Sequence, residues 1–168
     1  MARTIDLNVT TYWWIAGDAG IANPDAVSAA VLTVPLNISQ YLHSSTSVNP
    51  TSSDTVSEKG ITDVANVVTP IIGNYEGTLV GFRDMTAGTP SATDLLTLIG
   101  KTAGVVGWVV RRKGFASSAV AAATQKVDVF KFATDNPQVS GGQGDGMLKA
   151  TIPMLPQGVF RIETALVA

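Results

Sequence analysis

The sequence predicts a mainly β protein, a sandwich or barrel of about eight strands with one flanking α-helix. Several short segments alternate apolar and polar residues with a period of two, which is typical of half-buried strands. Two further segments are apolar on both faces, as in strands that are covered on both sides. A single segment combines a helix start, an apolar stripe and a terminal glycine. The 168 residues fit one domain, 1–168.

The alternating pattern predicts strands in both halves of the chain. In the segment 147–152, Leu148 and Ile152 oppose Lys149 and Thr151. Alternation of this kind places one set of side chains toward a core and the other toward solvent. The same alternation predicts strands at 36–42 (LNISQYL) and 159–164 (VFRIET). The segment 75–82 (YEGTLVGF) is predicted as another strand, loosened by Gly77 and Gly81.

Two segments are apolar on both faces. In 104–112 (GVVGWVVRR), Trp108 and Val109 point to opposite sides of the expected strand. The segment 126–132 (KVDVFKF) begins with Val127 and Val129 on one face and then changes to Phe130 and Phe132 on the other. Either a β-bulge or a strand covered on both sides explains the change.

One α-helix is expected in TPSATDLLTLIGK. Ser91 with Asp94 three residues later resembles a capping box, and Gly100 can end the helix. The stripe between them consists of Leu95, Leu98 and Ile99. A second short helix is expected after Asn23, Pro24 and Asp25.

Residues 43–57 (HSSTSVNPTSSDTVS) are rich in Ser and Thr and carry one charge, which predicts a long loop. Loops of this length are uncommon in compact domains unless they are functional or disordered. The chain as a whole has a net charge of −2 and only 14% charged residues, so it presents no global basic field to nucleic acid or membrane. No apolar segment approaches the ~20 residues that cross a bilayer.

The sequence does not predict an enzyme. The glycine-rich segment 141–146 (GGQGDG) lacks the Lys-Ser/Thr of a phosphate loop and precedes a strand, so we interpret it as a pliable connector between strands 126–132 and 147–152. His43 is the only histidine and there is no cysteine, which disfavours a metal site and leaves one residue for any hydrolase triad. We predict no catalytic, cofactor-binding or metal-binding residues and no cofactor.

Two features have more than one interpretation. The run Arg111, Arg112, Lys113 is the only basic cluster, and we favour a solvated strand end over a contact with phosphates or an acidic subunit. Trp13 and Trp14 must point to opposite faces of a strand, so one belongs to the core. The other either covers a helix or lies in an interface, where Trp is enriched.

The order of segments resembles the major tail tube proteins of long-tailed, siphovirus-type bacteriophages, and the likeness is closest to those of actinobacterial phages. The resemblance covers nearly the whole chain. It is carried by MARTID, PDAVSAAVLTVPLNISQYL, the Ser/Thr-rich loop, YEGTLVGFRD, SATDLLTLIGK, GWVVRRKG, KVDVFKF and MLKATIPM…VFRIETALVA.

The resemblance implies a structural subunit that forms stacked homohexameric rings around a DNA-conducting channel, with strands that join an intersubunit β-barrel. It implies other tail proteins at the tube ends, and a tape measure protein and transiting DNA in the lumen without specific binding. The protein is expected in the virion tail after synthesis in the host cytoplasm, with no membrane partner.

The same resemblance points to two sets of residues. The long loop, about 43–60, corresponds to the segment that reaches the neighbouring ring. Its candidate ring-stacking residues are Ser47, Val48, Asn49, Pro50, Thr51 and Asp54, and the candidate lumen residues are Glu58, Asp63 and Glu76. The alternatives are a receptor- or glycan-binding β-sandwich of a virion, a capsid decoration protein and, with least support, a small hydrolase built around His43.

Overall fold

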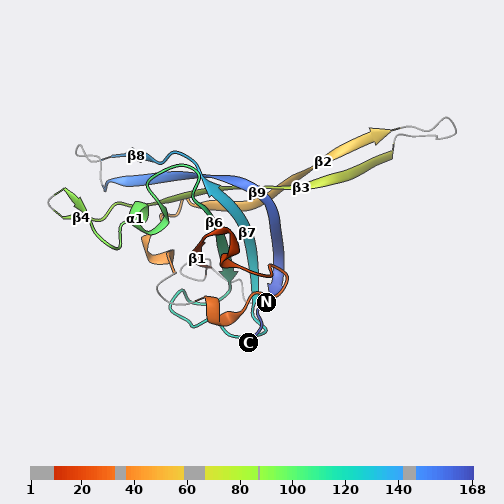
Figure 1. Cartoon of the computed structure of the whole chain (residues 1–168), viewed down its shortest axis with the longest axis horizontal. Coiled ribbons are helices and arrows are strands. Elements are labelled where there is room, and N and C mark those ends of the chain that lie inside the picture. Colours follow the sequence, from red (N-terminus) through yellow and green to blue (C-terminus); the bar gives the residue numbers. More distant parts are fainter. Residues whose placement is uncertain (1–9, 33–36, 59–66, 87, 142–146) are drawn as a thin grey trace, which may run out of the picture.

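The computed structural model describes residues 10–32, 37–58, 67–86, 88–141 and 147–168 (Figure 1). The described chain is mainly β with one α-helix, which confirms the predicted fold class. A 7-stranded antiparallel sheet has the order β1-β6-β7-β9-β3-β2, and β8 pairs with β9. Its strands are β1 (Thr10–Ala16), β2 (Ser47–Glu58), β3 (Val67–Phe82), β6 (Val106–Lys113), β7 (Lys126–Thr134), β8 (Gln138–Ser140) and β9 (Lys149–Ala165). A separate pair is formed by β4 (Met85–Thr86) and β5 (Thr89–Pro90).

Strand β9 joins the two halves of the sheet. Its residues 149–154 pair with β3, and from Met154 onward it pairs with β7 instead. Figure 1 shows β9 running beside β3 and then turning to follow β7. Gly158, with a φ of 72°, lies in this turn, next to a register shift between Phe130 and Phe132 of β7. The two predicted strands 147–152 and 159–164 are therefore parts of one long, bent strand.

The main core fills the space inside this bend. It contains Trp14, Leu79, Val109, Phe130 and other side chains from both halves of the sheet, and all of these are nearly inaccessible to water. The helix α1 (Leu95–Ile99) covers it with three buried side chains, Leu95, Leu96 and Ile99. Burial of this apolar surface is the dominant favourable contribution to folding.

A second core covers the opposite face of β1, β6 and β7. Trp13, Trp108, Val110 and Val129 pack there against Ile21, Val27, Leu32, Ala121 and Leu166 from the connecting segments. The segments 104–112 and 126–132 are thus apolar on both faces because the chain itself covers both faces. Trp13 and Trp14 are 2% and 3% exposed and lie in different cores, so the alternative that one of them lies in an interface is wrong. Trp14 belongs to the same core as the buried side chains of α1.

The change of face in β7 has both of the expected causes. Val127 and Val129 belong to the second core, whereas Phe130 and Phe132 belong to the main core. The register between β7 and β9 shifts twice, between Val127 and Val129 and between Phe130 and Phe132. β-Bulges of this kind bend a strand and re-aim its side chains.

The predicted strand at 36–42 is wrong. Asn37 and Leu42 form isolated bridges, and between them lies a 3₁₀-helix, η4 (Ser39–Tyr41). The Asn37 side chain accepts hydrogen bonds from the backbone nitrogen and the hydroxyl of Ser39 and donates to the carbonyl of Ser117. Such local side-chain bonds compete with strand ladders, which alternation alone does not reveal.

The predicted α-helix is present but begins differently from the prediction, and the second predicted helix is a short 3₁₀-helix. Asp94, rather than Ser91, is the N-cap of α1, and its carboxylate turns to Arg83 instead of capping the helix. Gly100 ends the helix as expected, with a φ of 139°. The first helical segment after Asn23-Pro24-Asp25 is the 3₁₀-helix η2 (Ala29–Val31), and a further 3₁₀-helix, η1 (Asp18–Gly20), precedes it.

Two predicted connections also differ. The strand β2 occupies 47–58, most of the expected Ser/Thr-rich loop, because these residues pair with β3 from Ser47↔Thr78 to Glu58↔Val67. The glycine-rich connector does not follow β7 directly, because β8 intervenes. Gly141 has a φ of 90°, and residues 142–146 lie outside the described part of the chain.

Candidate assembly surfaces

The outer parts of β2 and β3 form a hairpin that extends away from the body of the molecule (Figure 1). We call the described residues 49–58 and 67–74 of this hairpin the arm. Its base is fixed by Val48 and Tyr75, which are 0% and 4% exposed and belong to the main core. Beyond them every residue of β2 from 49 to 57 is exposed. An isolated two-stranded hairpin is only marginally stable in water, so an arm of this kind is suited to pairing with a further surface.

The candidate ring-stacking residues divide between the body and the arm. Val48 is fully buried, and Ser47 is half-buried beside it. The other four, Asn49, Pro50, Thr51 and Asp54, are exposed on the arm. The Asp54 carboxylate accepts a hydrogen bond of 3.0 Å from the side-chain amide of Asn74 on the facing strand.

The candidate lumen residues are not gathered into one described cluster. Glu76 is exposed on β3, opposite Asn49 at the base of the arm. Glu58 ends β2, where its backbone pairs with Val67. Asp63 lies outside the described residues.

The bend of β9 leaves strand edges open. Among the described strands, β3 pairs with β9 only over residues 77–82, so 67–76 of β3 have no strand on that side. Residues 155–165 of β9 likewise have only β7 beside them. The outer edge of β2 has no neighbour in the described sheet. Open edges expose unpaired backbone groups, which favour pairing with another chain.

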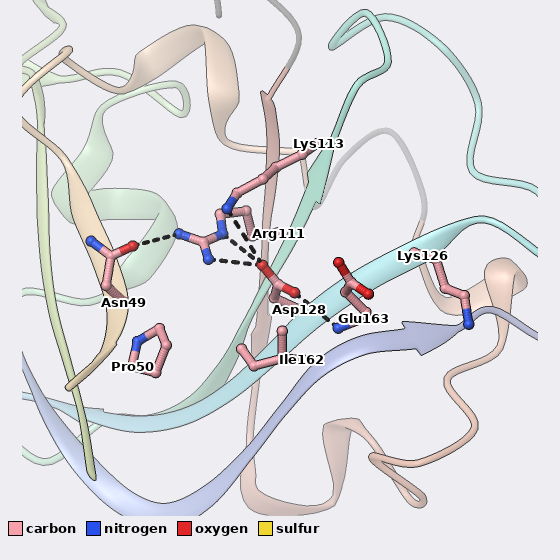
Figure 2. Close-up of a pocket in the computed structure, with 8 residues that line it drawn as sticks. All are labelled: Asn49, Pro50, Arg111, Lys113, Lys126, Asp128, Ile162 and Glu163. Atoms are coloured by element: carbon pink, nitrogen blue, oxygen red, sulfur yellow. Dashed lines mark hydrogen bonds and ion pairs between the residues drawn. The ribbon is translucent and has the colours of Figure 1, made fainter. Parts of the chain in front are cut away.

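A pocket of about 600 Å³ lies where the arm joins the body. Figure 2 shows its eight lining residues, which come from four strands: Asn49, Pro50, Arg111, Lys113, Lys126, Asp128, Ile162 and Glu163. Arg111 donates from Nε and Nη2 to Asp128 Oδ2, at 3.1 and 2.8 Å. Arg111 Nη1 also donates to the carbonyl of Val48 and to Asn49 Oδ1. The ion pair therefore fixes the base of the arm to β6 and β7.

Residues Arg111 and Arg112 are buried, so the preferred interpretation of the basic cluster as a solvated strand end is wrong for both. Arg112 is 0% exposed and has no carboxylate partner among the described residues; its guanidinium donates to Gln125 Oε1 and to the carbonyls of Ala116, Ala119 and Val120. It also lies over the rings of Trp13 and Phe115. Burial lowers the pKa of this guanidinium from its ordinary value. Of the three residues only Lys113 is exposed.

The surroundings of His43 do not resemble a hydrolase triad. Its Nδ1 lies 2.7 Å from Ser45 Oγ, but its Nε2 lies 3.3 Å from the ammonium group of Lys149, a cation where a triad has an orienting carboxylate. In the part of the chain that the structure describes, no three His, Cys, Asp or Glu side chains gather closely enough to hold a metal ion. No helix in that part has the length and apolar character to cross a membrane.

The comparison with protein families agrees with a role in assembly. A family model described as phage tail tube protein matches residues 1–168, which is the whole chain. No curated protein matches the chain. Membership of this family implies a structural virion component that self-assembles into a tail tube with other tail proteins. The chain belongs to the phage tail tube protein family.

Proposed function

We propose that the chain is the structural subunit of the tail tube of a siphovirus-type phage, similar to those of actinobacterial phages. In this proposal the subunits form hexameric rings that stack around a DNA-conducting channel. The arm is the observation that carries it, because residues 49–57 of β2 are exposed in the isolated chain. A contact with the neighbouring ring gives this exposed hairpin the partner that it lacks.

The open edges support the ring. Residues 67–76 of β3 and 155–165 of β9 each lack a strand partner on one side among the described strands. Pairing these edges around a ring closes them into an intersubunit barrel, which removes the edges that favour aggregation. The arm residues Asn49, Pro50, Thr51 and Asp54 then contribute to stacking, and Ser47 and Val48 hold the arm in place.

A channel for DNA must let the duplex pass without holding it. In the proposed tube, Glu58, Asp63 and Glu76 face the lumen, where their carboxylates repel the phosphates of transiting DNA. The tape measure protein occupies the same lumen before ejection, and other tail proteins close the ends of the tube. None of these partners requires a cofactor or a catalytic residue.

Negative-stain electron microscopy of the purified protein tests this proposal. The informative variant replaces residues 52–73 by Asn-Gly. Thr51 and Asn74 are directly paired, so a two-residue type I′ turn can join them without altering the body. Val48 and Tyr75 remain in the main core, so we expect this variant to fold as a monomer but to form no tubes.

The wild-type chain should form tubes of constant width with a central channel under the same conditions. Near-ultraviolet circular dichroism from the buried Trp13, Trp14 and Trp108 reports whether the shortened chain keeps the native core. Tubes of normal length from a folded, shortened chain would contradict the role of the arm. Small trimers from the wild type would instead favour a decoration or receptor-binding protein.

A further inference from the structure

The pocket at the base of the arm has an excess of positive charge at its rim. The Asp128 carboxylate is fully engaged, because Oδ2 accepts from Arg111 and Oδ1 accepts from the backbone nitrogen of Glu163 at 3.0 Å. Lys113 is 63% exposed and reaches only to 4.0 Å from Asp128, and Lys126 is exposed with no ion pair among the described residues. Against these two ammonium groups stands one exposed carboxylate, that of Glu163 (Figure 2).

The backbone is shaped to form this rim. Between the pairs Val127↔Thr164 and Val129↔Arg161, two residues of β9, Ile162 and Glu163, oppose Asp128 alone, which is a β-bulge. Glu163 has a φ of 54°, a conformation that costs a non-glycine residue about 1–3 kcal/mol. The bond from its nitrogen to Asp128 holds it there. Both bulged residues line the pocket, and Ile162 remains 44% exposed.

The arm has the opposite charge. Its described residues contain two acids, Asp54 and Glu58, and no base. Its formal charge is therefore −2, equal to that of the whole chain, and the rest of the sequence is balanced with eleven bases and eleven acids. Every subunit thus has an acidic extension and a pocket with a basic rim.

The arm of the same subunit cannot fill its own pocket. Asn49 and Pro50 line the pocket, and Asp54 lies four residues farther along the same extended strand. At ~3.3 Å per residue the Asp54 backbone is roughly 13 Å beyond Pro50, on a hairpin that leads away from the body (Figure 1). An Asp54 carboxylate that reaches the rim lysines must therefore come from another molecule.

We propose that this pocket receives the acidic arm of a second copy of the chain, with Lys113 and Lys126 bound to its Asp54 carboxylate and Ile162 in contact with the aliphatic part of the inserted strand. This inference rests on the proposed assembly of the tube and adds to it the surface on which the arm binds. The contact is heterologous, because arm and pocket are different surfaces, so it repeats from copy to copy as a stack requires. A phosphate backbone fits less well, because the Glu163 carboxylate stands between the two lysines and the pocket has no continuous basic track.

Charge reversal tests the inference. In Lys113→Glu/Lys126→Glu both altered side chains are exposed, so we expect a folded monomer whose melting temperature is close to that of the wild type. The critical concentration for tube formation should rise about tenfold or more, as measured by sedimentation and electron microscopy. Lys101→Glu, an exposed lysine of another surface, is the matched control and should assemble normally.

The second variant adds Asp54→Lys to the reversed pocket in the same chain, and it should restore assembly because both partners have changed sign. If the wild type and Lys113→Glu/Lys126→Glu both form normal tubes, the pocket inference is overturned and the proposed function stands. Lost assembly that the doubly reversed chain does not recover also overturns the pocket inference. Loss of binding to a fluorescein-labelled DNA duplex, with tube formation unchanged, assigns the pocket to phosphates instead. Absence of tubes from the wild type removes the proposed function and this inference with it.

Discussion

The hydroxyl of Tyr75 connects three strands at the point where β9 bends. It donates to the carbonyl of Lys131 in β7 at 2.5 Å, and it accepts from the backbone nitrogens of Gln157 and Val159 in β9 at 2.8 and 3.2 Å. Tyr75 itself lies in β3, at the base of the arm. The substitution Tyr75→Phe removes this one oxygen and keeps the ring, so it tests how much the oxygen stabilises the bend.

The expected loss of stability follows from these three bonds. The ring contacts with Phe130, Phe132 and Phe160 remain in the variant, so the apolar contribution is unchanged. Each lost hydrogen bond between neutral groups reduces the free energy of unfolding by about 1 kcal/mol, and more where the partner stays buried. Water can reach exposed Gln157 in place of the hydroxyl, whereas Val159 is half-buried. We therefore expect a total loss of about 2–3 kcal/mol.

Urea unfolding of the monomer, followed by tryptophan fluorescence, measures this loss directly. Tyr41→Phe is the matched control, because the Tyr41 hydroxyl bonds only with the exposed side chain of Gln40 in the described structure. That control should lose less than about 0.5 kcal/mol. A loss below about 1 kcal/mol for Tyr75→Phe, or equal losses for the two variants, would refute the role assigned to the Tyr75 hydroxyl.

Tyr75 should also make the free energy of unfolding depend on pH in the alkaline range. Burial raises the pKa of Tyr75 above its ordinary value, although the backbone nitrogens of Gln157 and Val159 act in the opposite direction. In the native state the Tyr75 hydroxyl therefore keeps its proton at a pH where the same hydroxyl has lost it in the unfolded state. The contribution to stability is complete below about pH 10 and decreases as the pH rises from there toward the raised pKa. Tyr75→Phe should flatten this alkaline decrease, and an unchanged slope would argue against it.

Three further substitutions test other parts of the fold by urea unfolding. Arg112→Met should cost about 2–4 kcal/mol, because carbonyls of the segment after β6 lose a charged donor, and limited chymotrypsin digestion should become faster at Phe115. Gly107→Ala should cost about 1–3 kcal/mol or more, since the new Cβ would lie 2.5 Å from the Trp14 ring; wild-type stability would contradict this packing. Asp128→Asn should cost roughly 3–5 kcal/mol, because Arg111 stays buried without its counter-charge, and a neutral effect would show that the pair is not needed.

The central strands could be predicted from the sequence because their side chains decide their position. In 104–112 and 126–132 both faces are apolar, and both faces are buried. What the pattern did not show is that the second cover comes from the connecting segments of the same chain rather than from neighbouring subunits. Ile21, Val27 and Leu32 are too widely spaced to form a recognisable period, so only the folded chain identifies them as a layer.

The arm could not be predicted, because its strand character does not come from its own composition. Ser, Thr, Asn and Pro between 47 and 54 are typical of a loop, yet these residues pair with β3 almost residue for residue. Strand propensity depends more strongly on context than helix propensity does, above all on cross-strand neighbours, and the partners here lie far along the chain, from Thr78 opposite Ser47 to Ile72 opposite Asp54. The length and low charge of the segment did indicate its importance for assembly, which stays a prediction.

The pocket at the base of the arm could not be predicted either, because the partners of the buried arginine side chains are not visible in the sequence. Arg111 and Arg112 occupy strand positions where valines precede them, and this continuity was the available signal that they point into the protein. Their partners, Asp128 and the carbonyls of the segment after β6, are brought to them only by the fold. The bulge that places Ile162 and Glu163 at the rim also has no signature in the sequence.

The features that the sequence concealed are those that a subunit of a polymer requires. The exposed hairpin, the open edges on β3 and β9 and the strained Glu163 beside the exposed Lys113 and Lys126 have no evident use in an isolated subunit. Propensity and hydrophobic pattern describe the parts of the fold that the chain stabilises by itself, and in the proposed tube they fail where another copy completes the contacts. The buried Arg111–Asp128 pair lies at the boundary between the two, because it fixes the root of the arm and forms the floor of the pocket. In the proposed stack, an arm and a pocket that share one rigid support keep a constant spacing between the two binding surfaces, and this constant spacing would let identical subunits repeat as a tube.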